Sequence, residues 1–550
     1  MPGSFRVGVE AVLPGSDWWA TIYGQILGEA FTPDVFAKSL KELGAEFTLF
    51  YDSLAPREER ACQRIADLCE RVGIDYLYNN TYGDIFGPWA PRTGRAEYSD
   101  EVLAYAVRGQ RFRGVILDEV EHRQIHHFDC GQGPYLADVA GCTVEQAYER
   151  VLAGLQAIVA RHRRFDGLTV GEMVFPVLAH VLARAGVVPA PKMLSVNYPA
   201  VAYAACVGAA MQYDTQLWAV QDFWSTDAFW AQQGAFAPGF SPQTYRSFLQ
   251  LAYWLGFDAT YTEGLHNLVW LRHLSPSERQ ALMDHPLGHR PPGEGGFLIG
   301  KGYALNAYGK IHRWFARNWL AGQNRPYSFR DLRPRVAIVR FPDGCWRVPT
   351  GGKGAFDAPF YGPGGPAPDR RHTAWLDLWP VLTHGVVPRG CLSLIGDKGY
   401  LQHRDAVAKD PYEYDYQEHL PFVPMDGVVV FDHLVDRSLL AGAELIVLTG
   451  HAVSEQTLQA AMDCVAAGAD CLAAPHLAGP ELARGPDTAP RLVRHGQGSI
   501  LVTDDFAGEP ARRFIVPHLG PANAIRYRFG EQLVDVRPCS CCGSQLVLQK

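Results

Sequence analysis

The sequence has no apolar run that approaches the roughly 18 residues needed to cross a membrane as a helix. It also has no basic stripe and no block of like charges, and its formal net charge of -8 is small for 550 residues. Without a basic surface, strong electrostatic binding to phosphate groups is not expected. We therefore expect neither nucleic acid nor a membrane as a partner.

An export signal is missing as well. The first residues, MPGSFRVGVEAVLP, do not combine a basic start with a continuous apolar core. The 12 cysteines are spread along the chain. In a chain of this length without an export signal, reduced thiols are expected instead of a disulfide framework. The predicted location is cytoplasmic.

The composition is typical of a globular protein with a large core, since 47% of the residues are hydrophobic and 12% are aromatic. At roughly 100–250 residues per domain, the length predicts two or three domains. Glycine and proline dominate Phe341–Pro368, which is therefore predicted to be a loop. The predicted domains are residues 1–330, 331–505 and 506–550.

Strand-like and helix-like segments alternate through the first of these domains. Strict alternation predicts a parallel sheet with helical crossovers, and eight units in this length predict a (β/α)8 TIM barrel. The predicted strands are Phe5–Leu13, Glu46–Asp52, Asp75–Asn80, Phe112–Glu121, Leu168–Met173, Lys192–Tyr198, Gln216–Phe223 and Ala259–Glu263. The predicted helices are Thr32–Leu43, Arg57–Val72, Asp100–Val107, Val144–Arg163, Val177–Ala185, Val201–Met211, Gln243–Leu255 and Tyr303–Trp319.

The second domain is predicted to be a small doubly wound α/β sheet of the flavodoxin-like type. Its predicted strands are Arg335–Arg340, Gly427–Phe431, Glu444–Leu448 and Asp470–Ala474, with Ser499–Thr503 as a further candidate, and its clearest helix is Ser454–Ala467. The last domain shows only short alternating runs and is predicted to be a small β region. The overall fold class is therefore α/β.

Polar residues recur at the carboxyl ends of the predicted barrel strands. A polar ligand pocket at a barrel mouth requires such residues, although strand ends that meet water are also often polar. The candidate substrate-binding residues are Glu10, Asp52, Asn79, Asn80, Asp118, Glu121, Glu172, Asn197, Tyr198 and Trp224. Trp18, Trp19 and Trp230 are further aromatic candidates for stacking on a ligand, with core packing as the alternative.

Glu119 is the leading candidate for a catalytic carboxyl group, because it follows the apolar run of Gly114–Leu117. Two-residue alternation predicts that Glu119 faces the mouth and that Asp118 points to the other side of the strand. A structural ion pair is the alternative explanation. Glu263 ends the last predicted strand and Asp222 lies near the end of the strand before it, and either could be the second carboxyl group.

The segment AELIVLTGHAVSEQTLQAAMDCVAAGADCLAAP follows the order strand, turn, helix, glycine, strand. It is similar to the glutamine-amidotransferase-like trimerisation domain of bacterial β-galactosidases. The barrel with its strand-end carboxylates resembles the same proteins and related retaining glycoside hydrolases of clan A. The sequence departs from that family at Asp118-Glu119, where Asn-Glu is usual, and the usual four-cysteine zinc cluster is not evident.

The resemblance implies a carbohydrate substrate and a retaining mechanism with two carboxyl groups. It implies Glu119 as the acid/base and a glutamate near the end of strand seven as the nucleophile. We favour Glu263 for this second role, with Asp222 as the alternative. The resemblance further implies a homo-oligomer, either a trimer or a dimer.

Other functions stay open at this point. The same pocket could serve an inverting hydrolase or a sugar lyase, or a carbohydrate-binding or assembly protein without catalysis. We expect no cofactor and no metal, because the group His122, His126, His127 and Cys130 fits no strong zinc signature, and the CSCC sequence at 539–542 lacks a second pair. No cysteine stands at the Thr449-Gly450-His451 turn, so the second domain is predicted to be structural.

Overall fold

The computed structural model describes residues 5–12, 33–51, 59–80, 98–121, 124, 135–174, 176–193, 199–222, 242–265, 268, 305, 307–342, 347–349, 355–357, 361–362, 364–366, 370–386, 422–479, 489–540 and 546–549. Among these residues, no helix combines the length and the apolar character that a membrane crossing requires.

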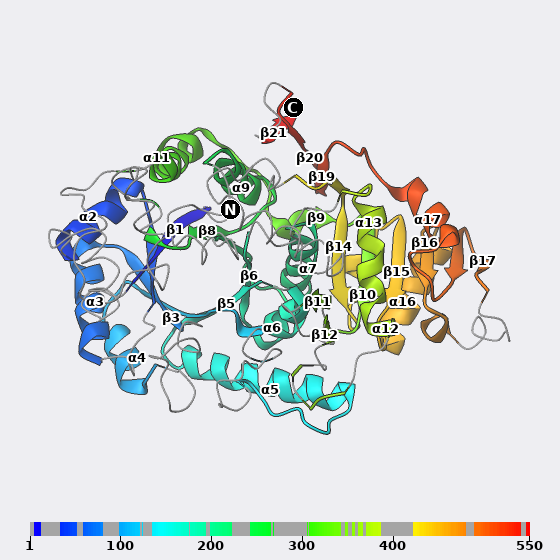
Figure 1. Ribbon diagram of the computed structural model, residues 1–550, viewed down its shortest axis with the longest axis horizontal. Coiled ribbons are helices and arrows are strands. Elements are labelled where there is room, and N and C mark those ends of the chain that lie inside the picture. Colours follow the sequence, from blue (N-terminus) through cyan, green and yellow to red (C-terminus); the bar gives the residue numbers. More distant parts are fainter. Residues whose placement is uncertain are drawn as a thin grey trace, which may run out of the picture.

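Eight parallel strands form a nearly closed barrel in the order β6-β5-β4-β3-β2-β1-β8-β7 (Figure 1). The two end strands, β6 and β7, are joined by one bridge between Lys192 and Val220, which closes the ring. This arrangement fits the predicted (β/α)8 TIM barrel. The strands are β1 (Arg6–Val12), β2 (Phe47–Tyr51), β3 (Asp75–Asn80), β4 (Phe112–Leu117), β5 (Leu168–Met173), β6 (Val188–Pro191), β7 (Trp218–Gln221) and β8 (Ala259–Thr262).

Helices surround the barrel and alternate with its strands (Figure 1). The longest, α5, begins after Thr143, which forms a capping box with Gln146. The Thr143 side chain accepts a hydrogen bond from the Gln146 amide, and the Gln146 side chain accepts one from the Thr143 amide. The barrel helices are α2 (Pro33–Leu43), α3 (Glu59–Val72), α4 (Asp100–Ala106), α5 (Val144–Arg163), α6 (Ala179–Ala185), α7 (Pro199–Gln212), α9 (Pro242–Trp254) and α11 (Ala307–Trp314).

The predicted sixth strand is wrong in position. The prediction placed it at Lys192–Tyr198, whereas β6 covers Val188–Pro191 and ends before Lys192. The two prolines of β6 argue against a strand, because proline cannot donate a backbone hydrogen bond to a neighbouring strand. The position of the strand end decides which residue reaches the barrel mouth.

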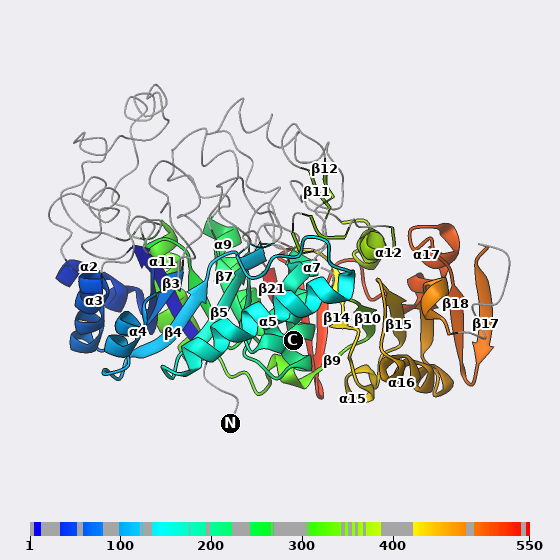
Figure 2. The same cartoon turned by 90° about the horizontal axis from the view of Figure 1, so that it is seen from below.

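A second sheet lies beside the barrel, in the order β14-β10-β15-β16-β18-β17 (Figures 1 and 2). Its strands are parallel except β17, which pairs antiparallel with β18 at the edge farthest from the barrel. The finer flavodoxin-like assignment stays a prediction. The strands are β10 (Val336–Arg340), β14 (Val428–Asp432), β15 (Leu445–Thr449), β16 (Asp470–Ala473), β17 (Arg491–His495) and β18 (Gly498–Val502).

Two further sheets are present among the described residues, and only the C-terminal one was predicted, as a small β region. The segment predicted as a Gly/Pro loop contains an antiparallel pair, β11 (Arg347–Pro349) with β12 (Ala355–Asp357). The C-terminal strands form a sheet to which two earlier segments of the chain also contribute. Its strands are β9 (Leu332–Arg333), β13 (Met425–Asp426), β19 (Ile525–Phe529), β20 (Gln532–Pro538) and β21 (Leu546–Gln549).

Barrel helix α7 packs directly on β14 of the second sheet. At Gly208 the backbones approach so closely that a Cβ atom would lie 1.8 Å from the Val430 carbonyl oxygen. On the neighbouring helix α6, the ring of His180 bonds the same carbonyl at 2.9 Å. Gln212 and Tyr213 both bond the buried carboxylate of Asp432. The small residues of α7 therefore allow close contact between barrel and sheet.

Candidate active site

The polar site at the barrel mouth continues the apolar layer inside the barrel. Side chains of a strand alternate between its two faces, so the residue two positions after an interior residue points inward again. On six consecutive strands this next inward residue is polar. The pairs of interior and polar residue are Leu77 and Asn79, Ile116 and Asp118, Val170 and Glu172, Ala190 and Lys192, Val220 and Asp222, and Tyr261 and Glu263.

Lys192 lies at the centre of this layer, and its side chain is only 2% exposed. Its Nζ atom is 3.0 Å from Glu119 Oε1, to which it donates a hydrogen bond. The same atom lies close to four further carboxylates, which come from the ends of β4, β5, β7 and β8. The distances are 3.3 Å to Asp118, 3.1 Å to Glu172, 3.5 Å to Asp222 and 3.2 Å to Glu263.

The predicted orientation of Asp118 is wrong. Asp118 shares the inward face with Ile116, and it approaches Lys192 as closely as its neighbours do. Glu119 reaches the same ammonium because β4 ends at Leu117 and the chain turns, with Glu119 at a φ of 43°. Such a left-handed backbone costs a non-glycine residue about 1 kcal/mol and is often found at functional sites.

Glu10, from β1, is tied to the same layer. Its Oε1 atom accepts a hydrogen bond from Asn79 Nδ2 at 2.6 Å, and its side chain is almost completely buried. On β8, which neighbours β1, the Tyr261 hydroxyl donates a hydrogen bond to Glu172 of β5. The layer is thus a connected polar network on top of an apolar core.

Burial raises the pKa of several of these acids. Desolvation, with smaller contributions from Asp118 and Asp222, raises the pKa of Glu10 to about 8, although Lys192 and Asn79 act to lower it. Desolvation likewise raises the pKa of Glu172 and that of Glu263 well above the ordinary value. Lys192 lowers both pKa values, but not enough to cancel burial and the like charges nearby.

Lys192 itself is stabilised as an ammonium ion. Burial alone would lower its pKa, but the surrounding carboxylates, with Glu119 and Glu263 first, raise the pKa well above the ordinary value. Six acids therefore surround one described cation, and they cannot all be ionised in a buried site. Protons must be shared among them, as general acid–base chemistry requires.

The exposure of the acids differs in a way that bears on ligand access. The side chain of Glu263 is 30% exposed and that of Glu119 is 15% exposed. Asp222 and Glu172 are only 4% and 1% exposed. A ligand that enters the mouth would therefore meet Glu119 and Glu263 before Asp222.

Two predicted binding residues lie away from Lys192. Asn80 points to the other face of β3, where its Nδ2 atom donates to the Tyr135 hydroxyl at 3.2 Å. Glu121 is buried and accepts a hydrogen bond from the Val174 amide. The remaining candidates lie outside the described residues: Asp52, Asn197, Tyr198, Trp224, Trp18, Trp19 and Trp230, and the group His122, His126, His127 and Cys130.

Lys192 was not among the site residues predicted from the sequence. The predicted sixth strand began at Lys192, which would place this residue at the end of the strand far from the mouth. In the structure, Lys192 directly follows the last residue of β6 and therefore lies at the mouth. The alternation of Val188, Ala190 and Lys192 would have shown the inward position. Among the described residues, no group of His, Cys, Asp and Glu is arranged to hold a metal ion, and the described cysteines are free thiols.

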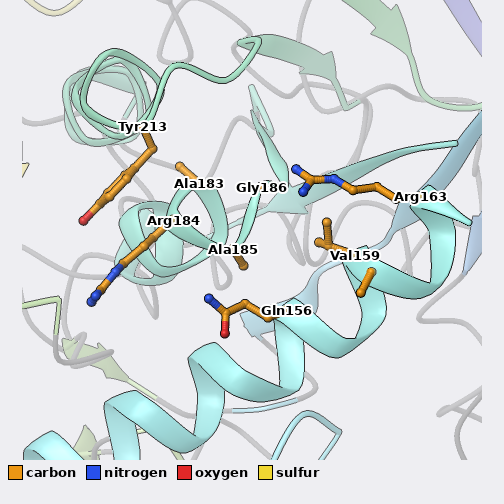
Figure 3. Close-up of a pocket in the computed structure, with 9 residues that line it drawn as sticks. Gln156, Val159, Arg163, Ala183, Arg184, Ala185, Gly186 and Tyr213 are labelled. Carbon is orange, nitrogen blue, oxygen red and sulfur yellow. The ribbon is translucent and has the colours of Figure 1, made fainter. Parts of the chain in front are cut away.

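A separate hollow lies on the outside of the barrel, between the carboxyl-terminal parts of α5 and α6 (Figure 3). Arg163 and Arg184 line it together with Tyr213. Arg184 donates to the Tyr148 hydroxyl, and Tyr213 donates to Asp432. These residues precede β5, β6 and β7, so the hollow is at the end of the barrel opposite the carboxylates.

No family model matches this sequence, and no curated protein matches it. Among solved structures, the chain is similar to the exo-beta-1,4-mannosidase Op5Man5 from Opitutaceae bacterium strain TAV5, with 13% identity, a TM-score of 0.48, and coverage of 94% of this chain and 97% of that one.

It is also similar to Gan42B, a GH42 beta-galactosidase from G. stearothermophilus, with 9% identity, a TM-score of 0.44, and coverage of 97% and 92%. A third similar structure is GH5_18 from Streptomyces cattleya in complex with GlcNAc, with 16% identity, a TM-score of 0.37, and coverage of 62% and 85%.

Proposed function

We propose that this protein is a glycoside hydrolase that cleaves a short oligosaccharide or glycoside with retention at the anomeric carbon. Glu119 and Glu263 are the two carboxyl groups in this proposal, with Glu119 as acid/base and Glu263 as nucleophile. The observation that carries the proposal is the contact of both side chains with the same Lys192 nitrogen, at 3.0 and 3.2 Å.

The shared contact limits the distance between the two acids. Because both oxygens lie near one nitrogen, these two atoms are at most about 6.2 Å apart, a limit that is compatible with the spacing of retaining enzymes. Retaining enzymes hold their two carboxyl groups about 5–5.5 Å apart. This spacing supports our proposal of direct attack by a carboxylate.

The exposure of the side chains supports Glu263 over Asp222 as the second acid. Asp222 is close to Lys192, but its side chain is nearly buried, whereas that of Glu263 is partly open. Asp222 also raises the pKa of Glu263. We therefore assign Asp222 an electrostatic role, in which its charge helps to set the pKa of Glu263.

One observation favours the reverse assignment of roles. A nucleophile must be ionised before it attacks, yet burial raises the pKa of Glu263 well above the ordinary value. Glu119 makes the shortest contact with the ammonium, at 3.0 Å. In this second candidate mechanism, Glu263 donates the proton and Glu119 attacks.

The test begins with a panel of aryl glycosides that includes β-galactosides and β-mannosides. Glu119→Gln and Glu263→Gln should each lower kcat/KM on the cleaved substrate by ~10²- to 10⁴-fold, because each removes a proton-transfer or nucleophilic group. Glu101→Gln, at an exposed position of α4, is the matched control and should retain full activity. Full activity in either active-site variant would remove that residue from the mechanism.

Product analysis then separates the mechanisms. NMR of the first product should show the same anomer as the substrate, whereas the opposite anomer would establish inversion. Azide rescue of alanine variants assigns the roles, since the acid/base variant yields the retained glycosyl azide and the nucleophile variant yields the inverted one. An unsaturated product would indicate a lyase, and binding without turnover would indicate a carbohydrate-binding protein.

A further inference from the structure

We propose that Lys192 is a positioning residue of this site: its ammonium group holds the carboxylates of four strand ends together and allows more than one of them to be ionised at once. The part of this inference that concerns turnover rests on the proposed glycosidase function. The part that concerns proton distribution does not.

The geometry supports a bridging role. An ammonium group has three N–H donors, whereas Lys192 Nζ lies within 3.5 Å of five carboxylate oxygens. At least two of these contacts are therefore ionic attractions without a hydrogen bond of their own. Lys192 can exchange donors among the acids as protons move, without a change in its position.

The position of Lys192 in the backbone is firmly held. Its amide donates to the Met173 carbonyl of β5 at 2.8 Å, and the residue pairs with Val220 of β7. The next amide, of Met193, donates to the Val220 carbonyl, also at 2.8 Å. The ammonium therefore extends from the closing point of the barrel, between the strands that carry Glu172 and Asp222.

Lys192 carries the one positive charge among several buried carboxyl groups of the described site. The groups that face it are Asp118, Glu119, Glu172, Asp222 and Glu263, with Glu10 and the Tyr261 hydroxyl one contact further away. Loss of one positive charge from a buried group of acids makes their joint ionisation costlier. The site would then bind about one additional proton from solvent.

The experiment counts protonated carboxyl groups at pH 7 by isotope-edited infrared spectroscopy of the full-length protein. Lys192→Met should show about one more protonated carboxyl group per molecule than wild type. Lys192→Arg keeps the charge and should show no change. Lys310→Met, at an exposed position of α11, is the matched control. An unchanged count in a folded Lys192→Met variant would overturn the proposal.

A second measurement covers the case in which Lys192→Met does not fold. In wild type, the Cε resonance of Lys192, assigned by its loss in Lys192→Arg, should remain that of an ammonium ion up to at least the ordinary lysine pKa of about 10.4. A neutral amine signal below pH 9 would refute the role of Lys192 as a counter-ion, whatever the activity of the protein.

The kinetic test applies once a substrate is known. The acidic limb of the kcat/KM profile, which reports the ionisation of the nucleophile, should shift to higher pH by roughly 1–3 units in Lys192→Met. Lys192→Arg should restore the wild-type profile. A drop in kcat at every pH, with no shift of the limb, would indicate a merely structural role and contradict the inference.

Discussion

The buried carboxyl group of Glu10 should make the protein less stable as the pH rises, and Glu10→Gln should remove that loss. The pKa of Glu10 is about 8 in the folded protein, against an ordinary value of 4.5. A group with a raised pKa contributes stability that is fully present below the unfolded value and is lost as the pH rises through the folded value. The sensitive window is therefore about pH 4.5 to 8.

Each pKa unit corresponds to about 1.4 kcal/mol, so this shift predicts that wild type loses about 3 kcal/mol between pH 4 and pH 7 and about 5 kcal/mol by pH 9. Glutamine keeps the oxygen that accepts the Asn79 hydrogen bond, and it cannot ionise. Glu10→Gln should match wild type near pH 4 and exceed its stability by these amounts at higher pH.

The assay is urea denaturation of both proteins at a series of pH values from 4 to 9. Glu101→Gln, which alters an exposed acid of α4, should follow wild type throughout. A stability difference between Glu10→Gln and wild type that stays constant across this range would refute the reasoning. The expected gain also implies that wild type gives up stability to keep an ionisable group at its mouth.

Two further predictions concern the framework of the fold. Gly208→Ala should destabilise the protein by about 3 kcal/mol or more in thermal unfolding, because the new Cβ atom would clash with the Val430 carbonyl where the barrel meets the second sheet; a neutral result would mean that the two parts can separate. Burial alone would raise the pKa of Asp75, but hydrogen bonds from Arg113 and Arg6 outweigh it and lower the pKa. Asp75→Asn should therefore cost ~2 kcal/mol at pH 7, and the stabilities of the two proteins in denaturation should converge only as the pH falls below the ordinary value of 3.8 and through the lowered pKa of folded Asp75.

The barrel could be predicted from the sequence because its local signals agree with one another. The predicted bounds of β3, α5 and β5 match the structure, since an apolar run or a capped amphipathic pattern marks both ends of each. Second-sheet strands β10 and β15 are equally apolar and begin within one residue of the prediction. Strand β17, Arg491–His495, was missed because this short edge strand mixes charged and apolar residues and none of its side chains is fully buried.

Strand β6 shows why one barrel strand was misplaced. Its prolines, Pro189 and Pro191, argue against a strand in any reading based on residue preference. The amide of Lys192 donates to β5, so every second amide of this segment points to that side. The backbone nitrogens of the two prolines therefore face β7. Pairing between β6 and β7 is limited to the bridge at Lys192, so no hydrogen bond to β7 requires the N–H groups that the prolines lack.

The acids of the mouth illustrate how far alternation can identify a site. Side chains on a strand alternate between its two faces, so the residue two positions after an interior residue also points inward. Once Ile116 and Ala190 are known to lie in the interior, this rule predicts that Asp118 and Lys192 point inward. The sequence alone led to the opposite phase, with Glu119 inward, whereas the interior position of Ile116 means that alternation would point Glu119 outward. It lies beside Lys192 only because the chain turns at a left-handed residue that is neither glycine nor asparagine. No local preference encodes that turn, so the residue at the centre of the proposed mechanism owes its place to tertiary contacts, and its strained backbone is itself a reason to test its function first.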